Sequence, residues 1–183
     1  MYKEYAIKTL YLIRHAKSDW KSPVLGDIMR TLSKKGLRDL ETIGSYMALR
    51  KIMPDTILSS CALRAQLTAD GLAEKIGYQE DISYMDELYL TKSTIVLNVL
   101  AAQEESLDSI FLVGHNPALS ELVNQFTKEH FSKFPTLGIM ALKLDIDTWK
   151  DISEVSNAKI EFFIFPKQFK YYMPAQIQAT LAL

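Results

Sequence analysis

Residues 9–17 read Thr-Leu-Tyr-Leu-Ile-Arg-His-Ala-Lys, and residues 110–117 read Ile-Phe-Leu-Val-Gly-His-Asn-Pro. Each stretch is a short apolar run that ends in polar residues including a histidine, as a buried strand does when a functional residue follows it. In α/β proteins the carboxyl ends of the strands border the binding crevice. We therefore expect His15 and His115 to meet at one edge of a sheet.

Strand-like and helix-like segments alternate along the chain, which is typical of an α/β fold. Apolar runs predict strands at 9–13, 56–60, 82–85, 110–113, 138–144 and 160–165. Apolar residues at helical spacing predict helices over about 34–47, 63–75, 94–100 and 117–126. No internal repeat or linker divides the chain, so we expect one domain over residues 1–183 and leave the tail 167–183 unassigned.

Residues that favour helix ends flank the predicted helices. Ser33 is expected to cap the first helix, and Gly77 is expected to end the second. Ser93 or Thr94 is expected to cap the third helix. Asn116-Pro117 suits the start of the fourth, with the asparagine as the cap and the proline in the first turn.

The composition limits the possible functions. The chain has 22 acidic and 21 basic side chains and a net charge of −1, which argues against a nucleic-acid-binding surface, so any anion site must be local. Cys61 is the only cysteine, which suits a reducing compartment; as a phosphatase nucleophile it is disfavoured, because Arg64 follows after three residues instead of six. No apolar run approaches the ~18 residues that span a bilayer, and no signal peptide precedes the first strand. We expect a cytoplasmic protein without a membrane partner.

Arginine side chains accompany the two histidines. Arg14 directly precedes His15, and a guanidinium beside an imidazole is electrostatically unfavourable unless an anion lies between them. Arg64 follows a predicted strand in the first turn of a helix, where free backbone N–H groups also favour an anion. On local grounds a surface salt bridge suits Arg64 equally well. His115 precedes another helix, and the macrodipole and any nearby arginine would lower its pKa, keeping it neutral until substrate binds.

A metal site is disfavoured. His15 and His115 each lack a partner four residues away, and the neighbouring arginines would repel a cation. We therefore expect no metal and no cofactor. His130 lies in Lys128-Glu129-His130-Phe131, surrounded by charge, and is expected to be exposed and structural.

Four blocks of sequence together resemble the histidine phosphatase superfamily, which has the phosphoglycerate mutase-like fold. The blocks are Leu12-Ile13-Arg14-His15-Ala16-Lys17-Ser18, Asp27-x-x-Arg30-x-Leu32-Ser33-x-x-Gly36, Ser59-Ser60-x-x-Leu63-Arg64-Ala65-x-x-Thr68-Ala69 and Val113-Gly114-His115-Asn116-Pro117. They occur in the family's order, and the chain looks most like the small phosphohistidine phosphatases of the SixA type. The resemblance implies a single-domain three-layer α/β/α sandwich with a mostly parallel central sheet.

The resemblance also implies roles for the residues in these blocks. His15 would be the nucleophile that becomes phosphorylated, and Arg14, Arg64 and His115 would form the phosphate pocket. Ser18 would belong to the substrate-binding residues. Water would then hydrolyse the phosphohistidine without a metal.

Two departures from the superfamily concern charge and the proton donor. Where the commonest form has Arg-His-Gly followed by an acidic residue, this chain has Ala16 and Lys17, which weakens a mutase interpretation. Lys17 adds positive charge at the mouth of the site. It is expected to contact the substrate, a phosphorylated protein surface, and exposure to solvent without any contact is an equally good interpretation. Larger members place a glutamate after a central strand, so Glu87 is expected to be the proton donor, with Asp86 second. An equally good interpretation is that Glu87 and Asp86 are surface carboxylates near the start of a helix, with no catalytic role.

We therefore predict a metal-independent phosphohistidine phosphatase acting on a phosphotransfer protein. The short segment between the second and fourth strands leaves room for only two modest helices, so the site should be open. One alternative is a phosphatase of a small phosphoester or sugar phosphate, which requires a positioned acid. Another is a phosphate-recognising module without turnover. The sequence does not predict an oligomeric state.

Overall fold

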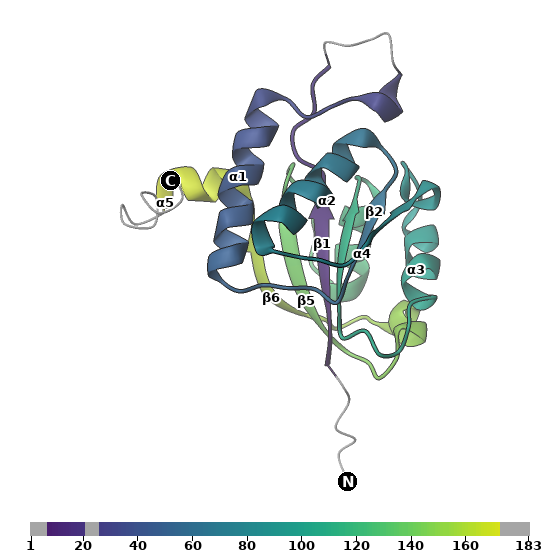
Figure 1. Ribbon diagram of the computed structural model, residues 1–183. Helices are drawn as coiled ribbons and strands as arrows, with labels where there is room; N and C mark the ends of the chain where they lie inside the picture. Colours follow the sequence, from purple (N-terminus) through teal and green to yellow (C-terminus); the bar gives the residue numbers. More distant parts are fainter. Residues whose placement is uncertain (1–6, 21–25, 173–183) are drawn as a thin grey trace.

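The first apolar run forms strand β1 (Ile7–Arg14), which lies inside a six-stranded sheet. The computed structural model describes residues 7–20 and 26–172 (Figure 1). In these residues the strand order is β3-β2-β4-β1-β5-β6, with β2 at Thr56–Ser60, β3 at Ile82–Met85, β4 at Ser109–Gly114, β5 at Ile139–Asp145 and β6 at Lys159–Ile164. Strands β3, β2, β4 and β1 are parallel, whereas β5 pairs antiparallel with both β1 and β6. The expected mostly parallel sheet is confirmed.

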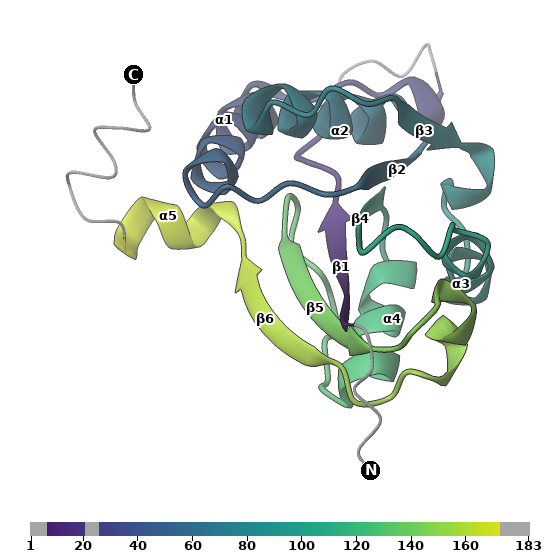
Figure 2. The ribbon, with the colours of Figure 1, turned by 60° about the horizontal axis from the view of Figure 1, so that its bottom comes forward.

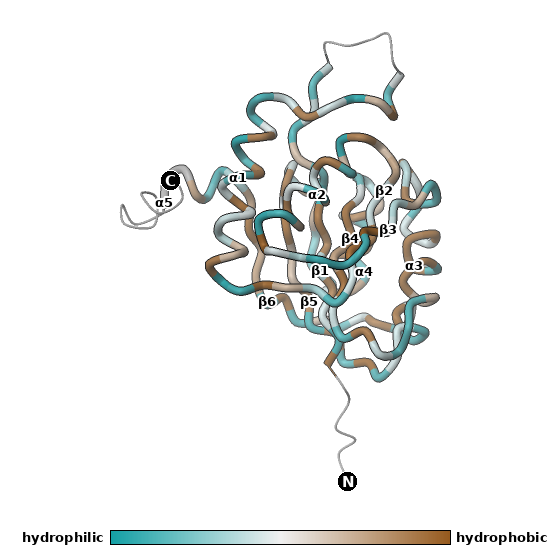
Figure 3. Tube along the Cα trace, viewed as in Figure 1, coloured by the Kyte–Doolittle hydropathy of each residue, from teal (hydrophilic) through white to brown (hydrophobic). Residues whose placement is uncertain are grey.

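Helices cover both faces of the sheet, because alternate side chains of a strand point to opposite faces. Leu10 and Leu12 of β1 pack in one core with α3 (Ser93–Ala101), α4 (Ala118–Thr127) and the 3-10 helix η4 (Trp149–Glu154). Tyr11 and Ile13 pack in the other core with α1 (Lys34–Leu49), α2 (Leu63–Ile76) and α5 (Pro166–Tyr172). Figure 2 shows these layers on either side of the sheet, and Figure 3 shows hydrophobic residues concentrated along the strands. The three-layer α/β architecture is confirmed.

Two of the predicted helix ends are confirmed and two are wrong. The Ser33 hydroxyl accepts a hydrogen bond from the Gly36 N–H at 3.1 Å, and Gly77 ends α2 in the left-handed conformation at φ 76°. Helix α3 has Lys92 at its N-cap position and no side-chain cap, since Ser93 is already its first helical residue. Asn116 does not cap α4, because its side-chain amide donates to the Phe134 carbonyl at 2.9 Å and its oxygen accepts from Ser120.

The tail, which the sequence left unassigned, begins as helix α5, whose Phe169 packs on Tyr46 of α1. The rest of the tail lies outside the described residues. Within residues 7–20 and 26–172, no helix combines the length and apolarity needed to cross a membrane.

The loop after β1 is anchored on the start of α1. The Lys17 carbonyl accepts from the Ser33 N–H at 2.8 Å, and the Asp19 N–H donates to the Thr31 carbonyl at 2.9 Å. Gly36 permits this approach, because a Cβ built there would lie 2.1 Å from the Lys17 carbonyl oxygen. The first turn of α1 therefore sets the position of the chain immediately after His15.

Gly36→Ala should destabilise the protein. Alanine gains about 1 kcal/mol of helix propensity over glycine. The overlap with a backbone oxygen forces α1 and the loop apart, and such overpacking costs roughly 1–3 kcal/mol. Urea unfolding measures the balance. Gly71→Ala is the matched control, because its Cβ would meet only the flexible Leu40 side chain, at 2.4 Å from Cδ2. Wild-type stability in Gly36→Ala together with a loss in Gly71→Ala would contradict this account.

Candidate active site

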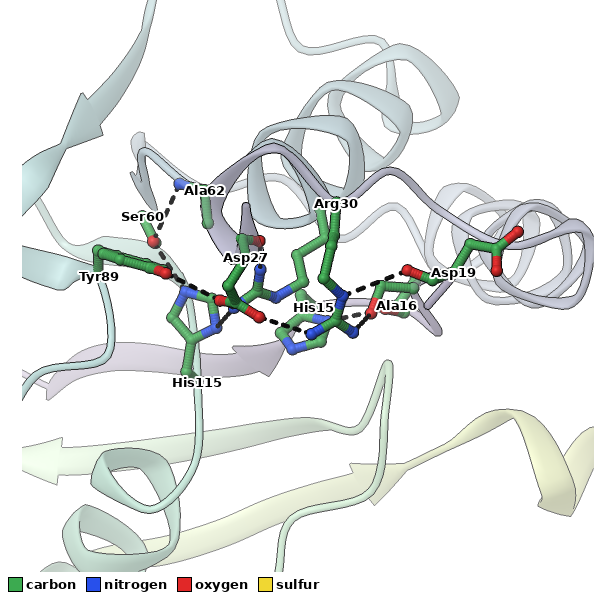
Figure 4. A network of polar contacts seen from close by, with 11 residues as sticks. His15, Ala16, Asp19, Asp27, Arg30, Ser60, Ala62, Tyr89 and His115 are labelled. Carbon is green, nitrogen blue, oxygen red and sulfur yellow. Dashed lines mark hydrogen bonds and ion pairs between the residues drawn. The ribbon is translucent and has the colours of Figure 1, made fainter. Parts of the chain in front are cut away.

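The parallel pairing of β1 with β4 brings the two histidines together. Arg14 and Gly114 are register partners at the carboxyl ends of these strands, and each is followed by a histidine. The rings of His15 and His115 lie with their centroids 5.1 Å apart (Figure 4). Both side chains are buried, at 8% and 5% exposure. The prediction that the two imidazoles meet at one edge of the sheet is confirmed.

The surroundings of His15 fix its protonation. Its Nδ1 lies 2.8 Å from the Ala16 carbonyl oxygen, which only accepts, so Nδ1 carries the proton and Nε2 keeps a free lone pair. Burial lowers the pKa of His15 to about 4, against the backbone hydrogen bond, and the charges of Arg64 and Arg14 add to the lowering. The ring is therefore neutral at physiological pH, with one nitrogen available as a nucleophile.

His115 is held between a hydroxyl and a guanidinium. Its Nε2 lies 2.8 Å from Ser60 Oγ, and its Nδ1 lies 3.5 Å from Arg64 Nη2. Because a guanidinium only donates, Nδ1 accepts and Nε2 donates to the serine. Burial lowers the pKa of His115 to about 3, with further lowering by His15 and Arg64. The lowered pKa of His115 agrees with the expectation of a neutral ring: burial is the largest cause, and Arg64 is the nearby arginine that adds to it.

Two arginines border the histidines. Arg14 donates from Nη1 to the Phe134 carbonyl at 2.6 Å, and its Nε is buried without a hydrogen-bond partner in the described part of the chain. Arg64, in the first turn of α2, is only 3% exposed. Burial and the charge of Arg64 lower the pKa of Arg14. An anion between the two guanidinium groups would relieve this repulsion and satisfy donors on both.

Asp27, on the 3-10 helix η2 (Asp27–Met29), is the carboxylate of the site. It accepts from Arg64 Nη2 at 3.0 Å, from Arg30 Nη1 at 2.7 Å and from the Tyr89 hydroxyl at 2.8 Å. Burial raises the pKa of Asp27, but the hydrogen bonds from Tyr89 and Arg30 and the charge of Arg64 outweigh it, and the pKa falls to about 2. Asp27 and Arg30 belong to the second sequence block, to which no role was assigned, and the spacing of that block is the only sequence signal for them.

These residues line an open cleft of about 640 Å³. Its lining includes five cationic side chains, Arg14, Lys17, Arg30, Arg64 and Lys133, and a single carboxylate, Asp27. Ser18 also lines it and accepts a hydrogen bond from Arg30, whereas Lys17 is exposed at the surface. The positive charge is therefore local, as expected for a chain of net charge −1. A second cleft, lined by four carboxylates, lies beside Asp145, which pairs with Ile7 at the other end of β1.

The expected proton donors lie apart from this lining. Glu87 and Asp86 are exposed on the 3-10 helix η3 (Asp86–Leu88), and neither lines the cleft.

Burial and a hydrogen bond to Asp86 raise the pKa of the Cys61 thiol, so it is protonated and a poor nucleophile. His130 is exposed, as expected.

Comparison with known proteins agrees with this geometry. The histidine phosphatase superfamily (branch 1) matches residues 10–89. A protein from Agrobacterium tumefaciens assigned as phosphohistidine phosphatase SixA is 31% identical, with a TM-score of 0.74 over 86% of this chain and 97% of that one. The protein histidine phosphatase SixA complexed with tungstate is 20% identical, with a TM-score of 0.75 over 88% and 99% of the two chains.

A more distant match extends the comparison. A mycobacterial glucosyl-3-phosphoglycerate phosphatase is 16% identical, with a TM-score of 0.62 over 85% of this chain and 97% of that one, and it shares the fold. The first match covers nearly the whole of its chain at 31% identity, and the superfamily match runs from within β1 to the end of η3. The chain therefore belongs to the histidine phosphatase superfamily, as a SixA-type phosphatase that uses a histidine nucleophile.

Proposed function

We propose that this protein removes phosphate from a phosphorylated histidine on a protein, with His15 as the nucleophile. One observation carries the choice of substrate: among the described residues, the only carboxylate lining the cleft is Asp27, and it is held ionised. A carboxylate with a pKa of about 2 has no proton to give at neutral pH.

The first step transfers the phosphoryl group to the enzyme. Nε2 of His15 attacks phosphorus in line, and the bond between phosphorus and the substrate nitrogen breaks with its electron pair on the substrate imidazole. The Nδ1–H of His15, which donates to the Ala16 carbonyl, supports the positive charge that develops on the ring. We assign Arg14, Arg64 and His115 to the equatorial oxygens of the phosphoryl group, because all three line the cleft beside His15.

The second step regenerates the enzyme. Water attacks phosphorus, the bond to His15 Nε2 breaks, and phosphate leaves with the oxygen of that water. Guanidinium groups supply the positive charge in both steps, so the proposal assigns no step to a metal or cofactor. Lys17 and Ser18, which also line the cleft, are proposed to contact the substrate.

The leaving group decides between substrate classes. An alkoxide leaving group needs a positioned acid, whose help is typically worth about 10²–10⁴-fold. The imidazole of a histidine has a pKa of roughly 6.5, so as a leaving group it can take its proton from water at physiological pH. The cleft is also open, with Lys17 and Lys133 at exposed positions, which suits a phosphohistidine carried by a protein such as a phosphotransfer domain. The single cysteine supports a cytoplasmic location.

A phosphatase of small phosphoesters is the second candidate. The fold is shared with the mycobacterial glucosyl-3-phosphoglycerate phosphatase, which acts on such an ester. In this chain the ester reaction would require Glu87 or Asp86 to reach the leaving oxygen from η3.

His15→Ala should abolish the phosphoenzyme. Mixed with a phosphohistidine peptide labelled on phosphorus, wild type should give an acid-labile, base-stable labelled protein in rapid-quench experiments. The variant should give none, and its turnover should fall by about three orders of magnitude or more. His130→Ala is the matched control, because this exposed histidine lies outside the cleft lining. Labelled phosphoenzyme in His15→Ala would sink the assignment of the nucleophile.

The double substitution Asp86→Asn, Glu87→Gln should leave turnover of the phosphohistidine peptide within about twofold of wild type, because the leaving imidazole needs no enzyme acid. Wild type should hydrolyse sugar phosphates, whose alkoxide leaving groups need an acid, far more slowly than the peptide. Fast sugar phosphate hydrolysis that drops about 100-fold in the double variant would favour the second candidate.

The nucleophile should stay reactive in mild acid. A protonated imidazole has no lone pair at Nε2, so acylation of His15 by diethyl pyrocarbonate should halve near its pKa of about 4. An unperturbed histidine would show half the reactivity near pH 6.5, roughly. The His130→Ala protein is treated at a series of pH values, and the residual phosphatase activity is then assayed at one fixed pH. Half-maximal inactivation near pH 6.5, the usual histidine value, would contradict a buried, neutral His15.

A further inference from the structure

We propose that Asp27 is a positioning residue. Its carboxylate fixes the orientation of the Arg64 and Arg30 guanidinium groups so that they can bind an oxyanion in the cleft. The inference rests on the phosphate-pocket role proposed above. Asp27 lies between β1 and α1, on η2, whereas both histidines of the site follow the ends of strands.

Asp27 holds Arg64 at two points. Nη1 of Arg64 donates to the Asp27 backbone carbonyl at 2.8 Å, and Nη2 donates to Asp27 Oδ2 at 3.0 Å. Two contacts from one residue fix the plane of the guanidinium as well as its location. Nη2 also approaches His115 Nδ1 at 3.5 Å, and Arg64 lines the cleft beside both histidines.

The second carboxylate oxygen holds Arg30. Nη1 of Arg30 donates to Asp27 Oδ1 at 2.7 Å, while its Nε donates to the Asp19 carbonyl at 3.2 Å and its Nη2 donates to the Ser18 hydroxyl. Ser18 and Asp19 belong to the loop that follows His15. As Figure 4 shows, the carboxylate thereby joins η2 to the chain that carries the nucleophile.

A third partner links Asp27 to His115. The Tyr89 hydroxyl donates to Asp27 Oδ2 at 2.8 Å, and the Tyr89 ring meets the His115 ring edge to face with centroids 5.9 Å apart. The carboxylate therefore has a donor from each of three segments: α2, the residue after η3, and Arg30 following η2. Loss of any one donor would leave the other two holding it.

Positioning and simple charge balance predict opposite changes in oxyanion affinity. Asp27 is negative among five cationic side chains that line the cleft. If it only balanced their charge, its removal would make the cleft more positive and phosphate would bind more tightly. If it positions the arginines, its removal lets them move and phosphate binds more weakly, despite the added positive charge.

Two substitutions separate charge from geometry. Asp27→Asn removes the charge and turns an NH₂ group toward donors of Arg30, Arg64 or Tyr89. Asp27→Glu keeps the charge but moves the carboxylate by one methylene. The affinity for inorganic phosphate is measured by titration calorimetry, and kcat and KM are measured with a phosphohistidine peptide. We expect both variants to bind phosphate about 10- to 100-fold more weakly and to lose a similar factor in kcat, with a smaller change in KM.

Controls keep the test decisive. Asp39→Asn makes the same change of charge on α1, where Asp39 pairs with Lys35, and should leave every value unchanged. Tyr89→Phe removes one donor and keeps the carboxylate, so its losses should be intermediate; with Asp27→Glu it carries the test should Asp27→Asn fail to fold. Tighter or unchanged phosphate binding in Asp27→Asn, or wild-type values in Asp27→Glu, would overturn the proposal. If the proposed function itself is wrong, wild type will form no phosphoenzyme in the rapid-quench experiment, and that result does not depend on the Asp27 variants.

Discussion

The site depends on the parallel pairing of β1 with β4. Their register places Arg14 opposite Gly114, so the residues that follow, His15 and His115, leave the sheet side by side. The strands themselves are buried on both faces between two apolar cores, which leaves little freedom for their ends to move. A one-residue slip would turn each side chain to the opposite face and part the two rings. The chemistry therefore inherits its precision from strand register.

Burial and charge act together at this sheet edge. Two imidazoles and two arginines meet as largely buried side chains in the cleft lining, and desolvation lowers the pKa values of His15, His115 and Arg14. Neutral imidazoles limit the repulsion, and the Asp27 carboxylate offsets part of what remains. The remaining positive charge is local to the cleft, so a chain with no net basic character still gathers cationic side chains where the proposed oxyanion would bind.

The sequence predicts features that follow from local pattern, but it does not predict features that depend on contacts between residues far apart in the chain. Strand ends follow from apolar runs, so the meeting of His15 and His115 was predictable before any coordinates. The role of Asp27 was not, because its donors Arg64 and Tyr89 lie 37 and 62 positions away and an irregular segment has no periodicity to place it. The Asn116 cap failed for a related reason, since tertiary contacts with Phe134 and Ser120 engage its side chain. The family resemblance suggested Glu87 as the proton donor, but that side chain lies on η3, outside the cleft lining.

The hold that Asp27 has on its partners and its low pKa have the same origin. Two guanidinium groups and a phenol donate to this carboxylate, and each donation favours the ionised form. Protonation would turn an oxygen that accepts into a hydroxyl that donates, and at least one arginine would lose its anchor. The same group therefore cannot both organise the arginines and supply a proton to a leaving group at neutral pH. The phosphohistidine substrate proposed above fits such a cleft, because its imidazole leaving group can take its proton from water.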